Sequence, residues 1–304
     1  MVLPTRNRSS MLMQAVSSAL SQEGVQLEVI VIDEGSSDDT PERLARIDDD
    51  RLGVIRHERP KGVAPARNAA IARARGEWIA FLDDDDLWAP DNLRTQLAAA
   101  GSGGHSLSYC RRIEIDEHGF VLHLSHPVHA DDLARRMLSN NVIGGPSGVL
   151  VRTDLLDRVG AFDESFSALA DWDLWIRAAA GGTAIACPEP LVAYRHHAQN
   201  MMTADPAAIM AEFDLLREKH RDRARRAGVE FGAAWLTRWR AARDLAEGRR
   251  LSAARAYFRA GVKLRDRRDL LRAVAALSGN LFQRVGQSAE RRMTARPDWL
   301  DRYA

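Results

Sequence analysis

The chain has 304 residues, 45% hydrophobic and 28% charged, which is typical of a globular protein with room for one large domain and a smaller appendage. It has two cysteines, Cys110 and Cys187, and no apolar run near the ~18 residues of a membrane-spanning helix. No disulfide framework is therefore implied, no membrane-spanning helix is expected in this sequence, and a reducing cytoplasm is expected. The N-terminus has no long apolar stretch, so no secretory signal is expected there.

Charge is distributed unevenly along the chain. Residues 1–204 carry 29 Asp and Glu against 20 Lys and Arg, whereas residues 205–304 carry 13 against 23. The amino-acid pattern changes at the same point. Short apolar runs separated by Gly, Pro and Asp give way to a tail rich in Ala, Arg and Leu. We predict a first domain over residues 1–204 and a helical region over 205–304.

The first 82 residues alternate predicted helices and strands. An apolar, β-branched run predicts a buried parallel strand at 27–32, and apolar runs predict further strands at 52–55 and 77–82. Apolar residues at helical spacing predict helices at 9–21, 41–47 and 64–74. This cadence is typical of an α/β fold with a mostly parallel central sheet flanked by helices.

The next stretch is less regular. Strands are predicted at 106–109, 149–151 and 191–194, a turn-rich loop at 144–148, and a helix at 171–180. Trp172, Trp175 and Ile176 share one face of that helix and are expected in the core, as is Trp88.

Three polar clusters follow predicted strands. They are residues 4–7 (PTRN), 33–36 (DEGS) and the four aspartates 83–86. Because ligands of parallel α/β sheets bind outside the carboxyl ends of the strands, these clusters are expected to converge on one site.

The four aspartates have two interpretations. In an extended backbone Asp83 and Asp85 point the same way, and two such carboxylates suit a hard divalent cation that also binds phosphates. The alternative is a solvated acidic loop that caps the helix beginning near Pro90. Asp86 is expected to face solvent or cap that helix.

Six motifs in order resemble those of family-2 glycosyltransferases. They cover about residues 2–203: PTRN (4–7), VIDEGSSDDT (31–40), GVAPARNAAIARARGEWIAFLDDDDLWAPDNL (62–93), GAFDESF (160–166), ALADWDLWIR (168–177) and YRHHAQNMM (194–202). The resemblance implies a Rossmann-like nucleotide-diphospho-sugar transferase fold of the A type, with the C-terminal helical region outside it.

The resemblance also implies roles for individual residues. The donor nucleotide would be held by Pro4, Thr5, Asn7, Asp33, Glu34 and Arg67, and Asp83, Asp84 and Asp85 would form the DxD motif. Asp84 would face the ribose or the donor sugar. Asp85 would be the main ligand of Mn²⁺ or Mg²⁺, with Asp83 and His197 beside it.

Asp171 matches the catalytic base of the family. An acceptor hydroxyl must lose a proton as it attacks the anomeric carbon, and a carboxylate can accept that proton. Asp173 is the competitor, but residues two apart on a helix face different ways. The simpler interpretation of Asp171, from the residue alone, is a helix N-cap.

The function implied is that of an inverting, metal-dependent glycosyltransferase of hexosyl type. It would move a sugar from a nucleoside-diphosphate donor, expected to be a UDP-sugar, to a glycan or lipid-linked acceptor in polysaccharide or glycoconjugate synthesis. Three departures from the family pattern support an alternative, a non-catalytic nucleotide-sugar-binding module: Glu34 in place of Asp, Ala170 in place of Glu, and a first strand with only Val2 and Leu3 before Pro4. Nucleotidyl transfer to a sugar phosphate is disfavoured because no Gly-rich triphosphate loop follows the first strand.

The tail is predicted to form helices at 207–227, 233–245, 249–263 and 270–285. We expect a helical appendage whose arginines face water. The alternative is peripheral contact with the inner face of the membrane, where lipid-linked acceptors lie. Nucleic acid is not expected as a partner, because the arginines are scattered and few aromatic residues lie among them.

Overall fold

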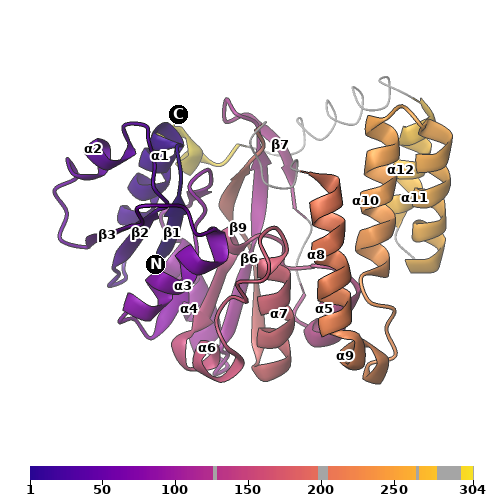
Figure 1. Cartoon of the computed structure of the whole chain (residues 1–304), viewed down its shortest axis with the longest axis horizontal. Coiled ribbons are helices and arrows are strands. Elements are labelled where there is room, and N and C mark those ends of the chain that lie inside the picture. Colours follow the sequence, from indigo (N-terminus) through magenta and orange to yellow (C-terminus); the bar gives the residue numbers. More distant parts are fainter. Residues whose placement is uncertain (126–128, 198–204, 265–266, 279–295, 304) are drawn as a thin grey trace. The chain divides into compact units, whose positions relative to one another are not determined.

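The structure is a computed structural model that describes residues 1–125, 129–197, 205–264, 267–278 and 296–303 (Figure 1). The chain divides into two compact units. Unit 1 comprises residues 1–134, 143–216 and 296–304, and unit 2 comprises residues 135–142 and 217–295.

Unit 1 begins with a parallel sheet of order β1-β2-β3. Its strands are β1 (Val2–Thr5), β2 (Val29–Asp33) and β3 (Leu52–Arg56). All residues of β1 and β2 are buried, as expected for strands that are covered on both faces. The helices α1 (Ser9–Leu20) and α2 (Thr40–Leu44) lie between these strands in the chain, and α3 (Val63–Arg73) follows β3. The first strand, β1, is short, and all four of its residues pair with β2.

A second, mixed sheet continues from the first. Its order is β4-β8-β6-β9-β5, with β7 paired to β6. Phe81, just after β4, bridges Val2 of β1 in parallel, and the amide of Leu82 donates to the Val2 carbonyl at 3.0 Å. The pairing of β6 with β9 is parallel and its other pairings are antiparallel. The strands are β4 (Trp78–Ala80), β5 (Leu87–Trp88), β6 (Leu107–Ile115), β7 (Val121–Leu124), β8 (Val149–Arg152) and β9 (Ala184–Arg195).

Helices connect these strands or follow them along the chain. They are α4 (Asn92–Gly101), α5 (Leu133–Ser139), α6 (Thr153–Val159), α7 (Ala170–Gly181) and α8 (Pro206–Lys219), with a short 3-10 turn at Pro146–Gly148. Trp88, Trp172 and Trp175 are fully buried, which confirms the prediction that they belong to the core. The predicted α/β fold class is confirmed. The parallel strand pairs are β1–β2, β2–β3 and β6–β9, whereas the other pairs of the second sheet are antiparallel, so this sheet is not mostly parallel as predicted.

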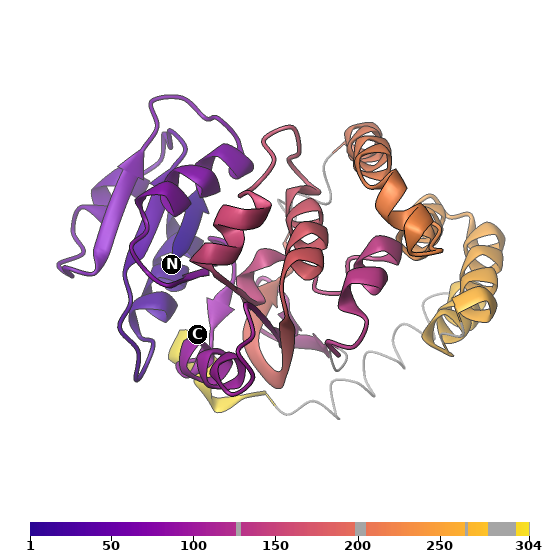
Figure 2. The same cartoon turned by 90° about the horizontal axis from the view of Figure 1, so that it is seen from below.

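The division into units differs in detail from a single boundary near residue 205. Part of α8 belongs to unit 1, and so does the C-terminal 3-10 segment Asp298–Tyr303, drawn in yellow in Figure 2. Leu300 is buried against Leu87, Ile113 and Ile115, so apolar burial explains why the chain end returns to this unit.

Unit 2 is helical. It contains α9 (Arg221–Arg226), α10 (Ala233–Ala246), α11 (Arg250–Leu264) and α12 (Arg267–Ser278). Its small core contains Ala241, Tyr257 and Ala273. The four helical segments predicted in the tail are observed, except that the part of the last one beyond Ser278 lies outside the described residues.

Candidate active site

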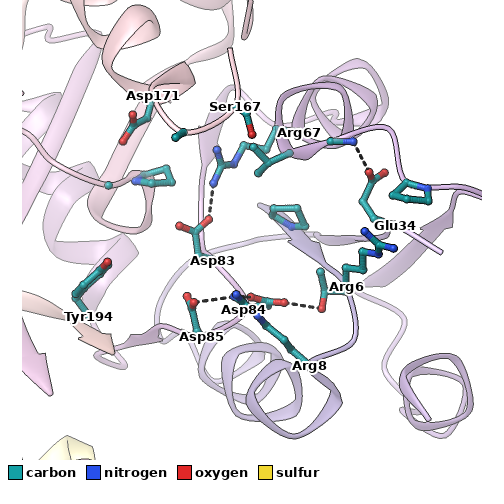
Figure 3. Close-up of a pocket in the computed structure, with 18 residues that line it drawn as sticks. Arg6, Arg8, Glu34, Arg67, Asp83, Asp84, Asp85, Ser167, Asp171 and Tyr194 are labelled. Carbon is teal, nitrogen blue, oxygen red and sulfur yellow. Dashed lines mark hydrogen bonds and ion pairs between the residues drawn. The ribbon is translucent and has the colours of Figure 1, made fainter. Parts of the chain in front are cut away.

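A cavity of about 430 Å³ opens in unit 1 where β1, β2 and the chain after β4 end (Figure 3). The three polar clusters therefore meet, as the strand order predicts. The lining residues come from these clusters, from the start of α3, from the segments around the 3-10 turn Pro146–Gly148 and the start of α7, and from β9. They are Pro4, Thr5, Arg6, Arg8, Glu34, Pro60, Gly62, Val63, Arg67, Asp83, Asp84, Asp85, Gly145, Pro146, Ser167, Ala168, Asp171 and Tyr194.

Asp83 is paired with a buried arginine. Arg67 on α3 is 5% exposed and donates through Nη2 to Asp83 Oδ1 at 2.5 Å. Its guanidinium also lies over the ring of Phe162, 5.2 Å from the centroid. Arg67 Nε is buried with no hydrogen-bond partner among the described residues. Since a buried donor without a partner is costly, this group is one that a ligand in the cavity would satisfy.

Asp84 and Asp85 share Arg8. Its Nη1 lies 3.0 Å from Asp84 Oδ1 and 2.8 Å from Asp85 Oδ2. The Thr5 hydroxyl donates to Asp84 at 2.7 Å, and His197 Nε2 lies 2.8 Å from Asp85 Oδ2. Burial raises the pKa of Asp84 to about 7, with a further contribution from the Asp85 carboxylate, and Arg8 opposes that rise.

Asp86 is buried, so the expectation that it faces solvent or caps a helix is wrong. It is 1% exposed and accepts hydrogen bonds from the Ser147 hydroxyl and from the backbone amide of Arg195. Burial and the neighbouring carboxylates of Asp85 and Asp83 raise its pKa well above the ordinary value. A chain turn that brings β5 next to β9 places this side chain inside the protein, which the local sequence does not reveal.

The arrangement explains how four consecutive aspartates are tolerated. Each contacts a cationic or hydrogen-bonding group from another part of the chain, which offsets the repulsion between like charges. Ligand oxygens of Asp83, Asp85 and Asp86 lie within 4.8 Å of one another. Carboxylate oxygens at this spacing fit a hard divalent cation.

The acidic residues Asp33 and Glu34, at the end of β2, form hydrogen bonds that hold the neighbouring loops. Asp33 accepts from the amide of Ser36 at 2.8 Å and from Arg56, and it does not line the cavity. Glu34 does line it, but both of its oxygens are engaged. It contacts His57, and it accepts from the amides of Lys61 and Gly62 at 2.6 and 2.7 Å. Glu34 thereby fixes the loop that leads into α3.

Asn7 joins two loops rather than lining the cavity. It has a positive φ of 54°, and its side-chain oxygen accepts from the amide of Ser37 at 2.7 Å. Its own amide donates to Ser36 Oγ at 2.9 Å. Arg6 and Arg8, on either side of it, are the residues that line the cavity.

Asp171 lines the cavity from the first turn of α7 (Figure 3). Its Oδ1 accepts from the amide of Trp172 at 2.6 Å, and Leu169 occupies the cap position, so Asp171 is not the N-cap. Burial raises the pKa of Asp171 to about 7, while Arg67 opposes the rise. Asp173 is fully buried and paired with Arg177 at 2.7 Å. Of the two aspartates, only Asp171 reaches the cavity.

The loop before α7 is held by a residue that the sequence did not single out. Glu212 of α8 accepts from the backbone amides of Ser167, Ala168 and Leu169 at 3.1, 3.2 and 3.0 Å. This carboxylate satisfies three donors near the helix start and so positions the turn that carries Asp171. Glu212 lies outside the family motifs, and its spacing from residue 171 carries no local signal.

Two other lining residues, Arg8 and Tyr194, were not predicted from the sequence. Arg8 directly follows the PTRN element, and its charge opposite an aspartate run is a signal that could have identified it. Tyr194 belongs to the YRHH segment of β9, and alternation along that strand with buried Ala193 was the available signal.

Comparisons with known proteins identify the family of the chain. The family model described as glycosyl transferase family 2 matches residues 1–160. The fold is that of nucleotide-diphospho-sugar transferases of the A type. The chain belongs to glycosyl transferase family 2.

Two relatives and one solved structure illustrate the similarity. The succinoglycan biosynthesis protein ExoO of Rhizobium meliloti is 43% identical over 107 residues, 35% of this chain and 31% of that protein. The UDP-Glc:alpha-D-GlcNAc-diphosphoundecaprenol beta-1,3-glucosyltransferase WfgD of Escherichia coli is 31% identical over 175 residues, 58% of this chain and 67% of that protein. TarS 1–349 of S. aureus, solved in complex with UDP-GlcNAc, superposes with a TM-score of 0.62 at 17% identity, covering 78% of this chain and 69% of that one.

The extent of these matches differs. The aligned segment spans about a third of the Rhizobium protein and two thirds of the E. coli enzyme. At 17% identity, the likeness to TarS concerns the fold, and it confirms the fold class predicted from the motifs.

Proposed function

We propose that this glycosyltransferase moves a sugar from a nucleoside-diphosphate donor, a UDP-sugar in the first instance, to a hydroxyl of a glycan or lipid-linked acceptor. We further propose that the transfer inverts the anomeric centre and requires Mn²⁺ or Mg²⁺. The observation that carries the proposal is that Asp171, the aspartates 83–85 and Glu34 line one cavity of about 430 Å³.

The cation would be held by Asp83 and Asp85, with His197 beside them. The donor set fits, because the oxygens of Asp83, Asp85 and Asp86 lie close together and are of the type that these cations prefer. Both oxygens of Asp86 accept internal hydrogen bonds, so we assign it to support of the group. When bound, the cation would neutralise the negative charge that develops on the leaving diphosphate.

The nucleotide would lie along the wall formed by Pro4, Thr5 and the start of α3. Glu34 would shape this wall by holding the amides of Lys61 and Gly62. Arg67 would offer its unpartnered Nε–H to an oxygen of the donor. Arg6, which lines the same wall, adds a positive charge suited to a phosphate-bearing ligand.

Asp171 would accept the proton of the attacking hydroxyl. With a pKa of about 7, its carboxylate is a stronger base than an ordinary aspartate and is still substantially ionised near neutral pH. The acceptor oxygen would form a bond to the anomeric carbon as the bond to the diphosphate breaks on the opposite face. An α-linked donor would then give a β-linked product.

The names of the relatives support the substrate classes proposed. One relative is named for succinoglycan biosynthesis, and the other for transfer from UDP-Glc to a diphosphoundecaprenol-linked sugar. We therefore propose polysaccharide or glycoconjugate synthesis, with donor and acceptor met on the cytoplasmic side. In the described part of the chain, no helix has both the length and the apolar character that crossing a membrane requires.

The test is donor turnover with Mn²⁺ or Mg²⁺ for the wild type, for Asp171→Asn and for Asp154→Asn. Asp154 is a surface residue of α6 and serves as the matched control. We expect the cavity variant to lose transfer by about 10²-fold or more and the control to retain it. Equal rates in all three proteins would refute the assignment of Asp171 as the base.

Glu34 and Ala170 differ from the residues common at these positions in the family pattern. They support one alternative, a nucleotide-sugar-binding module without catalysis. It predicts metal-dependent binding of a nucleoside diphosphate, measured by calorimetry, with neither sugar transfer nor donor hydrolysis. Transfer that EDTA abolishes and Mn²⁺ restores would exclude this alternative.

A further inference from the structure

Large apolar side chains are exposed mainly on two helices of unit 2. Nine such side chains are exposed in the described part of the chain, and six of them lie on α11 and α12. These six are Leu251 (66% exposed), Phe258 (58%), Val262 (58%), Leu271 (60%), Val274 (53%) and Leu277 (56%). Single exposed apolar residues are ordinary, but a contiguous group of this kind marks an interaction surface.

The two helices pack against each other closely, and residues of both line a groove. A Cβ on Gly261 would lie 2.7 Å from the Leu270 side chain, so the helices meet at a position with no side chain. The groove has a volume of about 500 Å³ and is lined by apolar residues that include Leu251, Phe258 and Val274. Arg255 and Arg259 also line it and are exposed.

Positive charge predominates in the segment that forms α11 and α12. The segment 250–278 contains eight arginine or lysine residues and two acidic residues. Of the acidic residues, Asp269 is fully buried and pairs with Arg238 and Arg272, each at 2.9 Å. Within the described residues of α11 and α12, the exposed surface thus combines apolar side chains with arginines and no carboxylate.

Charge decides between the partners that could cover such a surface. A second copy would bring the same positive surface and be repelled. The following segment of the chain, residues 279–295, carries three arginines and one glutamate, so it has the same sign of charge. A membrane that contains anionic lipids offers both an apolar interior boundary and negative headgroups.

We propose that the α11–α12 surface docks on a membrane that contains anionic lipids. Phe258, Val274 and their apolar neighbours enter the boundary between headgroups and acyl chains, and Arg255 and Arg259 contact lipid phosphates. The contact itself is independent of sugar transfer. Its consequence, delivery of the enzyme to a lipid-linked acceptor, rests on the proposed function.

The test is co-sedimentation of the full chain with vesicles of phosphatidylcholine alone or with about one third phosphatidylglycerol. Phe258→Glu is compared with Phe120→Glu, which replaces a phenylalanine of similar exposure (63%) on unit 1. We expect the wild type to bind the anionic vesicles, Phe258→Glu to bind at least about tenfold more weakly, and Phe120→Glu to bind like the wild type. A double variant, Arg255→Gln with Arg259→Gln, should lose the dependence on anionic lipid.

Three outcomes would overturn the proposal. The first is that the wild type stays in the supernatant with anionic vesicles. The second is that the two phenylalanine variants bind equally. The third is that vesicles of phosphatidylcholine alone bind the protein as well as the anionic mixture does. Self-association that Phe258→Glu abolishes, measured by light scattering without vesicles, would assign the surface to a second copy instead. Transfer to a water-soluble acceptor should be unchanged in Phe258→Glu, which separates this test from that of the proposed function.

Discussion

Arg8 Nη1 lies 2.8 Å from Asp85 Oδ2, so a fixed positive charge contacts the aspartate that we propose as the main metal ligand. The same nitrogen lies 3.0 Å from Asp84 Oδ1. Without a bound cation, this guanidinium is the group that compensates both carboxylates. Arg8 and a divalent cation would therefore stabilise the same negative charge.

Replacing Arg8 tests that relationship. In Arg8→Gln, two buried carboxylates lose their cationic partner, and we expect the metal-free protein to be less stable by about 1–3 kcal/mol. Mn²⁺ should then raise the melting temperature more in the variant than in the wild type, because the ion restores the missing charge. Thermal unfolding with and without Mn²⁺ measures this. An equal rise in both proteins would show that Arg8 and the ion do not share the site.

The activity should depend on pH through Asp171. Because the pKa of this residue is about 7, the base is protonated and inactive at lower pH. We expect kcat/KM to fall about tenfold per pH unit well below 7 and to level off above it. A bound cation beside Asp83 would move the midpoint downward, since positive charge favours the ionised carboxylate. A profile that is flat from pH 5 to 8 in the metal-loaded enzyme would contradict an Asp171 base.

Asp171 should also lower stability at neutral and alkaline pH. Its folded pKa of about 7 lies above the ordinary value of 3.8, so the folded protein binds the proton more tightly than the unfolded chain. Stability conferred by the protonated form is complete below about pH 4 and is lost as the pH rises through about 7. Asp171→Asn should therefore be more stable than the wild type by about 1–2 kcal/mol at pH 8, and nearly equal to it at pH 4. Urea unfolding at the two pH values checks this, and a gain that is the same at both would speak against the pKa as its cause.

Glu212 should support catalysis from outside the cavity. Glu212→Gln replaces a carboxylate that accepts three backbone amides with a neutral side chain that has one acceptor oxygen. Because the turn carrying Asp171 would be less firmly held, we expect kcat to fall about tenfold or more while the Kd for the donor nucleotide changes little. Glu218→Gln, an exposed substitution in the same helix, is the matched control. Weakened nucleotide binding with unchanged kcat would assign Glu212 to the donor side instead.

Much of the fold could be predicted because its signals are local. The run Val29–Asp33 begins with four apolar, β-branched residues, and such a run is typical of a strand that is buried on both faces of a sheet. The ends of β1, β2 and the segment after β4 converge because a parallel sheet brings its carboxyl edges together. Helix geometry indicated that only one of Asp171 and Asp173 would reach the site, and the motif resemblance selected Asp171. The motif resemblance added the family.

The residues that could not be predicted act across long stretches of chain. Asp86 was expected at the surface because four adjacent aspartates are typical of a solvent-exposed segment. In the structure it is buried and accepts hydrogen bonds from Ser147 and from the backbone of Arg195. The contacts of Asp33 with Arg56 and of Asn7 with Ser37 also join segments 23 and 30 positions apart, and the predicted contact of both residues with the nucleotide stays a prediction. Glu212 and Arg8 gave no strong signal, because their contacts lie 43 or more positions away in the chain.

The sequence alone determined the order of the elements, the acidic composition of the site and the basic, apolar character of the tail, because these depend on neighbouring residues and on periodicity. The tertiary structure decided which carboxylate is paired with which arginine, and which apolar side chains of α11 and α12 remain uncovered. Charge compensation and burial depend on distances between segments that are remote in the chain, and these distances exist only once the chain is folded.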